Sequence, residues 1–337
     1  MHRLQASDVT IAGVLVHPND RLVDVARALG LEVLPLPTEL CASRRRISEA
    51  LKSRRFRPQM DDWLRQFQAL APDFAIVFYG WWVPPELYDA PREPMINFHP
   101  APLPRNRGYD PETAAVLRDD RSTHGTYHLI DSGFDTGEIL WQTNTVSLTP
   151  SETPLSILGK VTERGLEELP RLLEARQAGR LAPRPQPDNQ VDNVDPVHLA
   201  MHSIIDWRTD DHTMIERRHR AFNGKPSRIR LRARIGQAMC CIRRIATREG
   251  NFTGEVGAVI GQYPDSIASA ARDSPFRGAT LVRTRQGVAA CVIDHNCLAT
   301  GADCLVKAYC SMANSKVLPP GPIPDVLSDE RLERCLR

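Results

Sequence analysis

Several features that define particular classes of protein are missing from this sequence. No apolar run approaches the roughly 18 residues of a membrane span, and no secretory signal is evident. The cysteines include no C-x-x-C pair and no Cys/His spacing typical of zinc. We therefore expect a cytoplasmic protein with reduced thiols, no membrane partner and no metal site.

An excess of charge of one sign is also missing. The formal net charge is +2, which is too small to indicate a general nucleic-acid binder. Apolar content of 42% and charged content of 25% are ordinary for a globular protein. A length of 337 residues predicts about two domains. Composition alone therefore excludes several classes of protein but assigns no function.

The stretch Met95–Gly108 carries the first chemical signal. Its apolar start predicts a strand that contains Asn97 and His99, whose side chains share a face because strand residues i and i+2 do so. Prolines follow at alternate positions: Pro100, Pro102 and Pro104. Proline fixes φ and has no N–H donor, so regular structure stops here. A lone histidine at a strand end is more often structural, so this motif alone is weak evidence.

A second signal lies in the segment His124–Ile139. Alternating residues predict a strand that ends at Asp131, and a turn rich in glycine and aspartate then carries Asp135 between Gly133 and Gly137. Ligands of open α/β sheets bind beyond the strand ends. An amide, an imidazole and a carboxylate are thus expected on loops at such ends, and the pair of motifs is much more specific than either alone.

Together the motifs N-x-H-P-x-x-L-P-x-x-R-G and D-x-G-x-D-T-G-x-I resemble those of the folate-dependent formyltransferases. This family includes methionyl-tRNA formyltransferase, glycinamide ribonucleotide formyltransferase, the amino-sugar N-formyltransferases and the hydrolase domain of formyltetrahydrofolate dehydrogenase. The spacing from His99 to Asp135 also fits the family pattern. The motif pair is strong evidence for the family and weak evidence for the acceptor.

The resemblance implies an α/β fold, with a Rossmann-like, mostly parallel sheet in the N-terminal domain and a smaller OB-like β-barrel in the C-terminal domain. We expect a catalytic domain over 1–180, a linker over 181–203, the barrel over 204–318 and a tail over 319–337. Strands of the barrel are expected at Arg228–Ile235, Met239–Ile245, Val256–Gly261, Ala279–Arg283, Gly287–Ile293 and Cys304–Ala308. Similar enzymes begin with an earlier, central strand. Its absence suggests a truncation or a start placed too late, and would otherwise leave a sheet edge to be covered.

The resemblance also implies roles for individual residues. Asn97 would donate a hydrogen bond to the formyl oxygen, His99 would relay a proton, and Asp135 would favour the charged imidazole and hold a water molecule. None of these residues is a nucleophile suited to a covalent intermediate, so the formyl group must arrive on a carrier. By resemblance the carrier is 10-formyltetrahydrofolate, and tetrahydrofolate is the product.

The pterin ring of the carrier is expected to lie against loops that follow strands. Two adjacent tryptophans suit a flat heterocycle, although core packing would equally explain them. The residues assigned to the carrier are Trp81, Trp82 and Val83, then Ala101, Pro102, Leu103 and Pro104, and finally Asp131, Ser132, Gly133 and Phe134.

Basic residues gather in two regions. Cys41–Pro58 is rich in arginine and suits a polyanionic acceptor, although a solvated helix face with Ile47 and Leu51 inside is the simpler interpretation. Alternating arginines over Arg228–Arg234 suit nucleic acid, as barrels of this type can bind it. The simpler interpretation there is the outer face of a strand, with these residues inside: Ile229, Leu231, Ala233 and Ile235.

The acceptor that we favour is a small amine, such as an amino sugar nucleotide or an amino-acid-derived metabolite. Enzymes that formylate tRNA carry a basic insertion after the second strand, whereas His17–Asp20 leads directly into a helix here. They also have a lysine-bearing linker, whereas Asp188–Asp206 contains no lysine or arginine. Phosphate contacts dominate nucleic-acid affinity, so both differences disfavour methionyl-tRNA, while the basic barrel favours it.

Two further functions are compatible with the same motifs. One is a 10-formyltetrahydrofolate hydrolase, in which water replaces the amine. The second is a non-catalytic homologue that binds folate or nucleic acid. The sequence does not indicate the oligomeric state.

Overall fold

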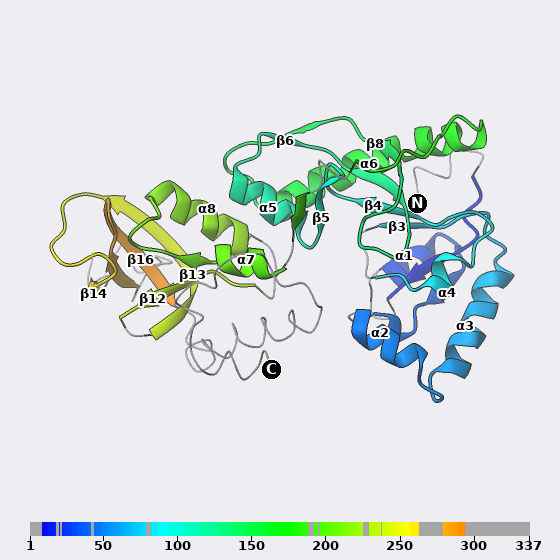
Figure 1. Cartoon of the computed structure of the whole chain (residues 1–337), viewed down its shortest axis with the longest axis horizontal. Coiled ribbons are helices and arrows are strands. Elements are labelled where there is room, and N and C mark those ends of the chain that lie inside the picture. Colours follow the sequence, from blue (N-terminus) through cyan, green and yellow to red (C-terminus); the bar gives the residue numbers. More distant parts are fainter. Residues whose placement is uncertain are drawn as a thin grey trace. The chain divides into compact units, whose positions relative to one another are not determined.

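The computed structural model describes residues 9–17, 20, 22–41, 44–78, 82–187, 192–194, 196–224, 229–236, 238–262 and 279–293 (Figure 1). The chain divides into two compact units. Unit 1 contains residues 1–108, 122–147 and 158–193, and unit 2 contains residues 109–121, 148–157 and 194–337. Unit 2 thus takes in two segments from the first half of the chain. Within the described residues, no helix has the length and apolar character needed to cross a membrane.

The strands of unit 1 form separate sheets. The strands β1 (Val14–Val16) and β2 (Val33–Pro35) form a parallel pair, and α1 (Leu22–Ala28) connects them in the chain. A four-stranded sheet has the order β3 (Ile76–Phe78), β4 (Ile96–His99), β7 (Thr126–Leu129) and β8 (Ile139–Gln142). In it β3 and β4 run parallel, whereas β7 is antiparallel to both of its neighbours. The expected α/β fold with parallel strands is confirmed in part, because β1–β2 and β3–β4 are parallel pairs whereas the larger sheet is mixed.

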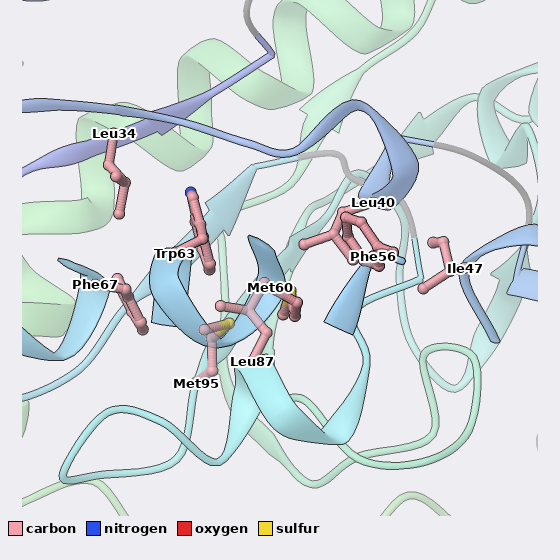
Figure 2. Close-up of a cluster of buried hydrophobic side chains, with 9 residues drawn as sticks. All are labelled: Leu34, Leu40, Ile47, Phe56, Met60, Trp63, Phe67, Leu87 and Met95. Carbon is pink, nitrogen blue, oxygen red and sulfur yellow. The ribbon is translucent and has the colours of Figure 1, made fainter. Parts of the chain in front are cut away.

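A buried apolar cluster lies between the β1–β2 pair and the four-stranded sheet of unit 1. Met60, Trp63 and Phe67 recur at helical spacing along α3 (Arg57–Ala69), so they form one apolar stripe. Figure 2 shows this stripe among side chains from the surrounding elements. The Trp63 indole N–H donates to the Pro35 carbonyl oxygen at 2.8 Å, which ties α3 to β2. The other cluster members are Leu34, Leu40, Ile47, Phe56, Leu87 and Met95.

Shorter elements connect these parts. They include η1 (Thr38–Leu40), α2 (Arg44–Leu51), α4 (Pro85–Tyr88), β5 (Arg105–Gly108), β6 (Ser122–Thr123) and β9 (Val146–Ser147). Ile47 of α2 is fully buried, as a helix with a solvated basic face requires, and Arg46 is exposed.

The long helix α6 (Pro154–Gln177) packs on the four-stranded sheet through Phe98. A Cβ atom at Gly125 or at Gly165 would lie 2.4 Å from the Phe98 ring, so glycine lets strand and helix close on this ring. The Tyr127 hydroxyl donates to the Gly165 carbonyl oxygen at 2.8 Å. The polar side chains of β4 therefore face away from a tightly packed apolar layer.

Unit 2 contains a sheet with the order β11 (Ile204–Ile205), β12 (Arg232–Ile235), β13 (Ala238–Glu249), β16 (Gly287–Ile293), β15 (Thr280–Arg283) and β14 (Val259–Gln262). The pair β11–β12 is parallel and the other pairs are antiparallel. The described part of unit 2 also contains the helices α5 (Pro111–Arg118), α7 (Pro196–His202), which follows β10 (Asp192–Val194), and α8 (His212–Asn223). These strands overlap the predicted ones, whereas the strand expected at Cys304–Ala308 and the tail over 319–337 lie outside the described residues.

The alternation over Arg228–Arg234 is only partly confirmed. The expected inner residues are all buried, namely Ile229, Leu231, Ala233 and Ile235. Arg230 and Arg234 are exposed, but Arg232 is 2% exposed, so its placement on an outer face was wrong. The physical reason is that β12 is an interior strand, and the turn before β11 brings Ser203 over Arg232.

Candidate functional site

Sheet register brings the first polar side chains together. Asn97 of β4 lies directly opposite His128 of the antiparallel strand β7, and opposite residues of such a pair have Cβ atoms about 4.5–5.5 Å apart. The Asn97 Nδ2 atom is 3.0 Å from the His128 Nε2 atom. His99 follows on the same face of β4, as the alternation predicted. The strand pair thus carries an amide and two imidazoles.

Asp135 is the common partner of these side chains. Its Oδ1 atom accepts from Asn97 Nδ2 at 3.3 Å and lies 3.4 Å from His128 Nε2. Its Oδ2 atom accepts the Gly108 backbone N–H at 3.0 Å and lies 3.5 Å from His99 Nδ1. The structure therefore brings Asn97, His99 and Asp135 within direct contact distance.

The loop that carries Asp135 is held by its own side chains. The Asp131 carboxylate accepts the Thr136 hydroxyl at 2.6 Å. A Cβ atom at position 137 would lie 1.9 Å from the Leu129 carbonyl oxygen, so only glycine fits beside the end of β7. Asp135 itself has a φ of 53°, in the left-handed region that non-glycine residues rarely adopt. Such strain at a polar cluster is a common mark of a functional site.

Gln186 connects this loop to β5. Its side-chain amide donates to the backbone oxygens of Asp135 at 2.8 Å and Gly137 at 2.6 Å. Its Oε1 atom accepts from Arg107 Nε at 2.8 Å. Since Gln186 is buried, these bonds are shielded from water and fix the loop against the strand that follows the proline segment.

The network keeps Asp135 ionised. Burial alone would raise the pKa of this carboxyl, but attraction to His99, the nearby His128 ring and the Gly108 N–H together lower it to about 2. Asp135 therefore carries a full negative charge throughout the neutral range.

His99 lies between groups that only accept hydrogen bonds. Its Nε2 atom is 2.8 Å from the backbone oxygen of Asn106, and its Nδ1 atom faces the Asp135 carboxylate. The backbone of Asn106 is left-handed, with a φ of 61°, in the turn that presents this oxygen. Because both ring nitrogens face acceptors, the arrangement suits a ring that is protonated on each of them.

The residues expected to hold the carrier differ from one another in burial and in hydrogen bonding. Trp81 lies outside the described residues. Trp82 and Val83 are partly buried and pack against the apolar cluster of Figure 2, so part of their surface serves the core.

Several backbone groups of the proline loop, residues 101–104, are already hydrogen-bonded within the chain. The Thr126 hydroxyl donates to the Ala101 oxygen at 2.8 Å and accepts the Leu103 N–H at 3.2 Å. The Leu103 oxygen accepts from Gln142 Nε2 at 2.8 Å. Pro104 is buried and Pro102 is partly buried.

The third loop is more open. Ser132 is exposed and Gly133 is partly buried, and Gly133 donates its N–H to the Asp131 carboxylate at 3.0 Å. The Phe134 side chain is 51% exposed next to Asp135. A large exposed aromatic ring beside a polar cluster suits contact with a flat heterocycle, so this loop fits the ring of the carrier best.

Sequence reasoning missed several residues of this site. His128 was predicted only as part of an alternating strand, and neither the Gly108 N–H nor Gln186 was predicted to contact Asp135. The position of His128 shares its parity with Thr126 and could have suggested a common face. Its contact with Asn97 depends on pairing between β4 and β7, which carries no local signal.

Comparisons with known proteins add independent findings. Residues 5–173 match the model of the family described as formyl transferase. The methionyl-tRNA formyltransferase of Synechococcus sp. (strain JA-3-3Ab) is 31% identical over 204 residues, which are 60% of this chain and 60% of that protein. The chain thus spans about three fifths of the length of that relative. The methionyl-tRNA formyltransferase of Acidiphilium cryptum (strain JF-5) is 34% identical over 66% of this chain and 69% of that protein.

A solved structure is similar in fold. HypX from Aquifex aeolicus, in complex with tetrahydrofolic acid, matches 82% of this chain and 42% of its own, with a TM-score of 0.53 and 18% identity. At this identity the likeness concerns the fold alone.

Proposed function

The chain belongs to the formyl transferase family, and from this premise we propose that it transfers a formyl group from 10-formyltetrahydrofolate to a primary amine of a small acceptor. The observation that carries the proposal is the convergence of Asn97 and His99 on Asp135. The Asn97 Nδ2 atom is 3.3 Å from Asp135 Oδ1, and the His99 Nδ1 atom is 3.5 Å from Asp135 Oδ2. An amide, an imidazole and a carboxylate are the groups that transfer of an already activated formyl group needs. The carrier supplies that activation.

Each residue has a role that its contacts support. Asn97 donates an N–H to the formyl oxygen as this atom gains charge, and an oriented donor of this kind contributes about 2.7–4 kcal/mol. His99 gives a proton to the leaving nitrogen, a role that suits a ring held between acceptors. Asp135 stays an anion with a pKa of about 2, so it stabilises the positive imidazole rather than taking a proton itself.

The carrier is assigned chiefly to the loop Asp131–Asp135. The exposed ring of Phe134 supports this choice, and the internal bonds of Ala101 and Leu103 leave less of the proline loop for a ligand. We further interpret the unit 2 sheet as the OB-like barrel of the family, and we infer that the protein works in the cytoplasm.

The small acceptor is supported by the stretch Asp188–Asp206, which contains no lysine or arginine, and by the absence of a basic insertion after His17 in the sequence. Methionyl-tRNA is a second candidate. It is favoured by the names of the relatives that are 31% and 34% identical.

The test is a formylation assay with purified protein and 10-formyltetrahydrofolate. The acceptors are a panel of amino sugar nucleotides and amino-acid-derived amines, alongside charged initiator tRNA. We expect formylation of a small amine that is abolished by His99→Ala. Formylation of the tRNA alone would select the second candidate. Formate release without any acceptor would instead identify a hydrolase, and folate binding without turnover would identify a non-catalytic homologue.

A further inference from the structure

The orientation of the Asn97 amide is determined by its surroundings. The amide nitrogen carries two N–H groups, and its neighbours are His128 Nε2 at 3.0 Å and Asp135 Oδ1 at 3.3 Å. The carboxylate can only accept, so the amide nitrogen and not the amide oxygen must face it. In this arrangement both N–H groups of Asn97 are engaged.

The His128 ring can accept one of these N–H groups only in one neutral form. Its Nδ1 atom is 2.8 Å from the Leu129 backbone oxygen, which must accept, so Nδ1 carries the proton. The Nε2 atom lies 3.4 Å from Asp135 Oδ1, but the Asn97 Nδ2 atom is closer, at 3.0 Å, and can only donate. Nε2 therefore presents its lone pair to Asn97. His128 is 3% exposed, so water does not compete for this bond.

We propose that His128 is a positioning residue, which anchors one N–H of Asn97 so that the other N–H is directed at the formyl oxygen. The proposal rests on the proposed function. The two bonds of the amide are unequal, because the contact with His128 is the shorter one. When the formyl group is bound, the second N–H exchanges Asp135 Oδ1 for the formyl oxygen, while the first stays on His128.

Asp135 tolerates this exchange. Its other oxygen keeps the Gly108 N–H at 3.0 Å and the contact with His99. No covalent bond changes in the step, and the amide makes as many hydrogen bonds after the exchange as before it.

A pair of variants tests the anchor in the formylation assay. His128→Phe keeps a ring of similar size but has no acceptor, so we expect kcat to fall about 100-fold, as for a misdirected transition-state donor. Each KM should stay within about threefold of the wild-type value, since the lost interaction is made only in the transition state. His128→Gln offers a side-chain oxygen as acceptor and should recover kcat to within about tenfold of wild type. An unchanged kcat in His128→Phe, or equal losses in both variants, would overturn the proposal.

A spectroscopic measurement on the free protein tests the same bond without catalysis. In protein labelled with ¹⁵N-histidine, the signals of His128 are identified by their loss in His128→Gln. We expect an unprotonated nitrogen at Nε2 and a protonated one at Nδ1. A proton on Nε2 would refute the anchor. This measurement still decides the matter if His128→Phe fails to fold, and it distinguishes a wrong anchor from a wrong function, because a protein without transferase activity still gives the signals.

The matched control is His212→Gln in unit 2. His212 is also a buried histidine, with Nε2 2.7 Å from the Thr284 hydroxyl. We expect its kcat to equal that of the wild type. A loss of kcat like that of His128→Phe would assign both effects to stability and contradict the positioning role.

Discussion

Two charged side chains with little exposure, Asp135 in unit 1 and Arg232 in unit 2, differ in the groups that surround them. In unit 1 the Asp135 carboxylate contacts Asn97, Gly108, His99 and His128. In unit 2 the Arg232 side chain is 2% exposed, its only side-chain hydrogen bond in the described part of the chain is to the Ser203 hydroxyl at 3.5 Å, and its Nε atom has no partner.

The comparison distinguishes two energetic effects of a buried ionic group. A charge surrounded by complementary groups is costly to remove, because its partners are left unpaired in a region that excludes water. A buried charge without a counterion costs free energy and is often replaced by an apolar side chain without loss. The difference indicates that Asp135 belongs to a hydrogen-bonded network, whereas Arg232 has no counterion among the residues that the structure describes.

The largest expected effect comes from breaking the network at its centre. Asp135→Asn removes the anion that faces both histidines, so the imidazole of His99 loses its stabilising charge. We expect kcat to fall about 1000-fold in the formylation assay, within the range of lost acid–base catalysis. Asp62→Asn is the control, since Asp62 is an exposed carboxylate paired with Arg65, and it should leave kcat unchanged. Equal activity of Asp135→Asn and the wild type would remove Asp135 from the site.

A paired arginine within unit 2 sharpens the comparison. Arg218 contacts the buried Asp210 carboxylate at 2.9 Å and also donates to the His202 oxygen. Arg218→Met removes the cation that faces the buried Asp210 carboxylate, so we expect a loss of about 3 kcal/mol in the free energy of unfolding measured with denaturant. Arg65→Met, which breaks an exposed pair, should cost less than about 1 kcal/mol. Equal costs for the two variants would show that burial does not strengthen the pair.

The pH dependence of stability tests the charge of Asp135 directly. Its pKa is lowered from 3.8 to about 2 in the folded protein, so folding favours the ionised form. Its contribution is therefore fully present above pH of about 4 and is lost as the pH falls through about 2. The difference in unfolding free energy between wild type and Asp135→Asn should shrink by about 2 kcal/mol between pH 6 and pH 2. A difference that stays constant over this range would contradict the shift.

The smallest effect is expected at Arg232. Arg232→Met replaces a buried cation that has no counterion within the described ranges with an apolar chain of similar length, so the free energy of unfolding should stay the same or rise by about 1 kcal/mol. Arg234→Met, at an exposed position of the same strand, should change it by less than about 0.5 kcal/mol. A loss of several kcal/mol in Arg232→Met would show that the charge is compensated after all, and the contrast between the units would fail.

The sequence predicted the parts of the site that depend on local pattern. Alternation placed Asn97 and His99 on one face, and the family motif added Asp135. It did not reveal His128 as their partner, because that contact depends on which strands pair. Sheet order is a long-range property, and for the same reason the separation of β1 and β2 from the larger sheet was not predicted.

The burial of a side chain was predictable only where the alternation of a strand alone determines it. The alternation correctly placed Ile229 and Leu231 inside, but Arg232 is covered by a turn that lies far from it in sequence. The proline loop remains a predicted contact of the carrier, but the bonds that Thr126 and Gln142 make to its backbone could not be predicted from local pattern. Local propensity carries no information about such partners.

The ring of Phe98 has a consequence for how this protein tolerates change. Phe98 stands between Asn97 and His99 in the chain, is 1% exposed, and is enclosed where Gly125 and Gly165 leave space. A one-residue slip of the strand would exchange its two faces. The packing of Phe98 therefore fixes the register of β4 and with it the direction of the Asn97 and His99 side chains. A methyl group added at Gly125 or Gly165 would displace this ring. Although neither glycine contacts the reacting atoms, the substitution would then lower the catalytic rate.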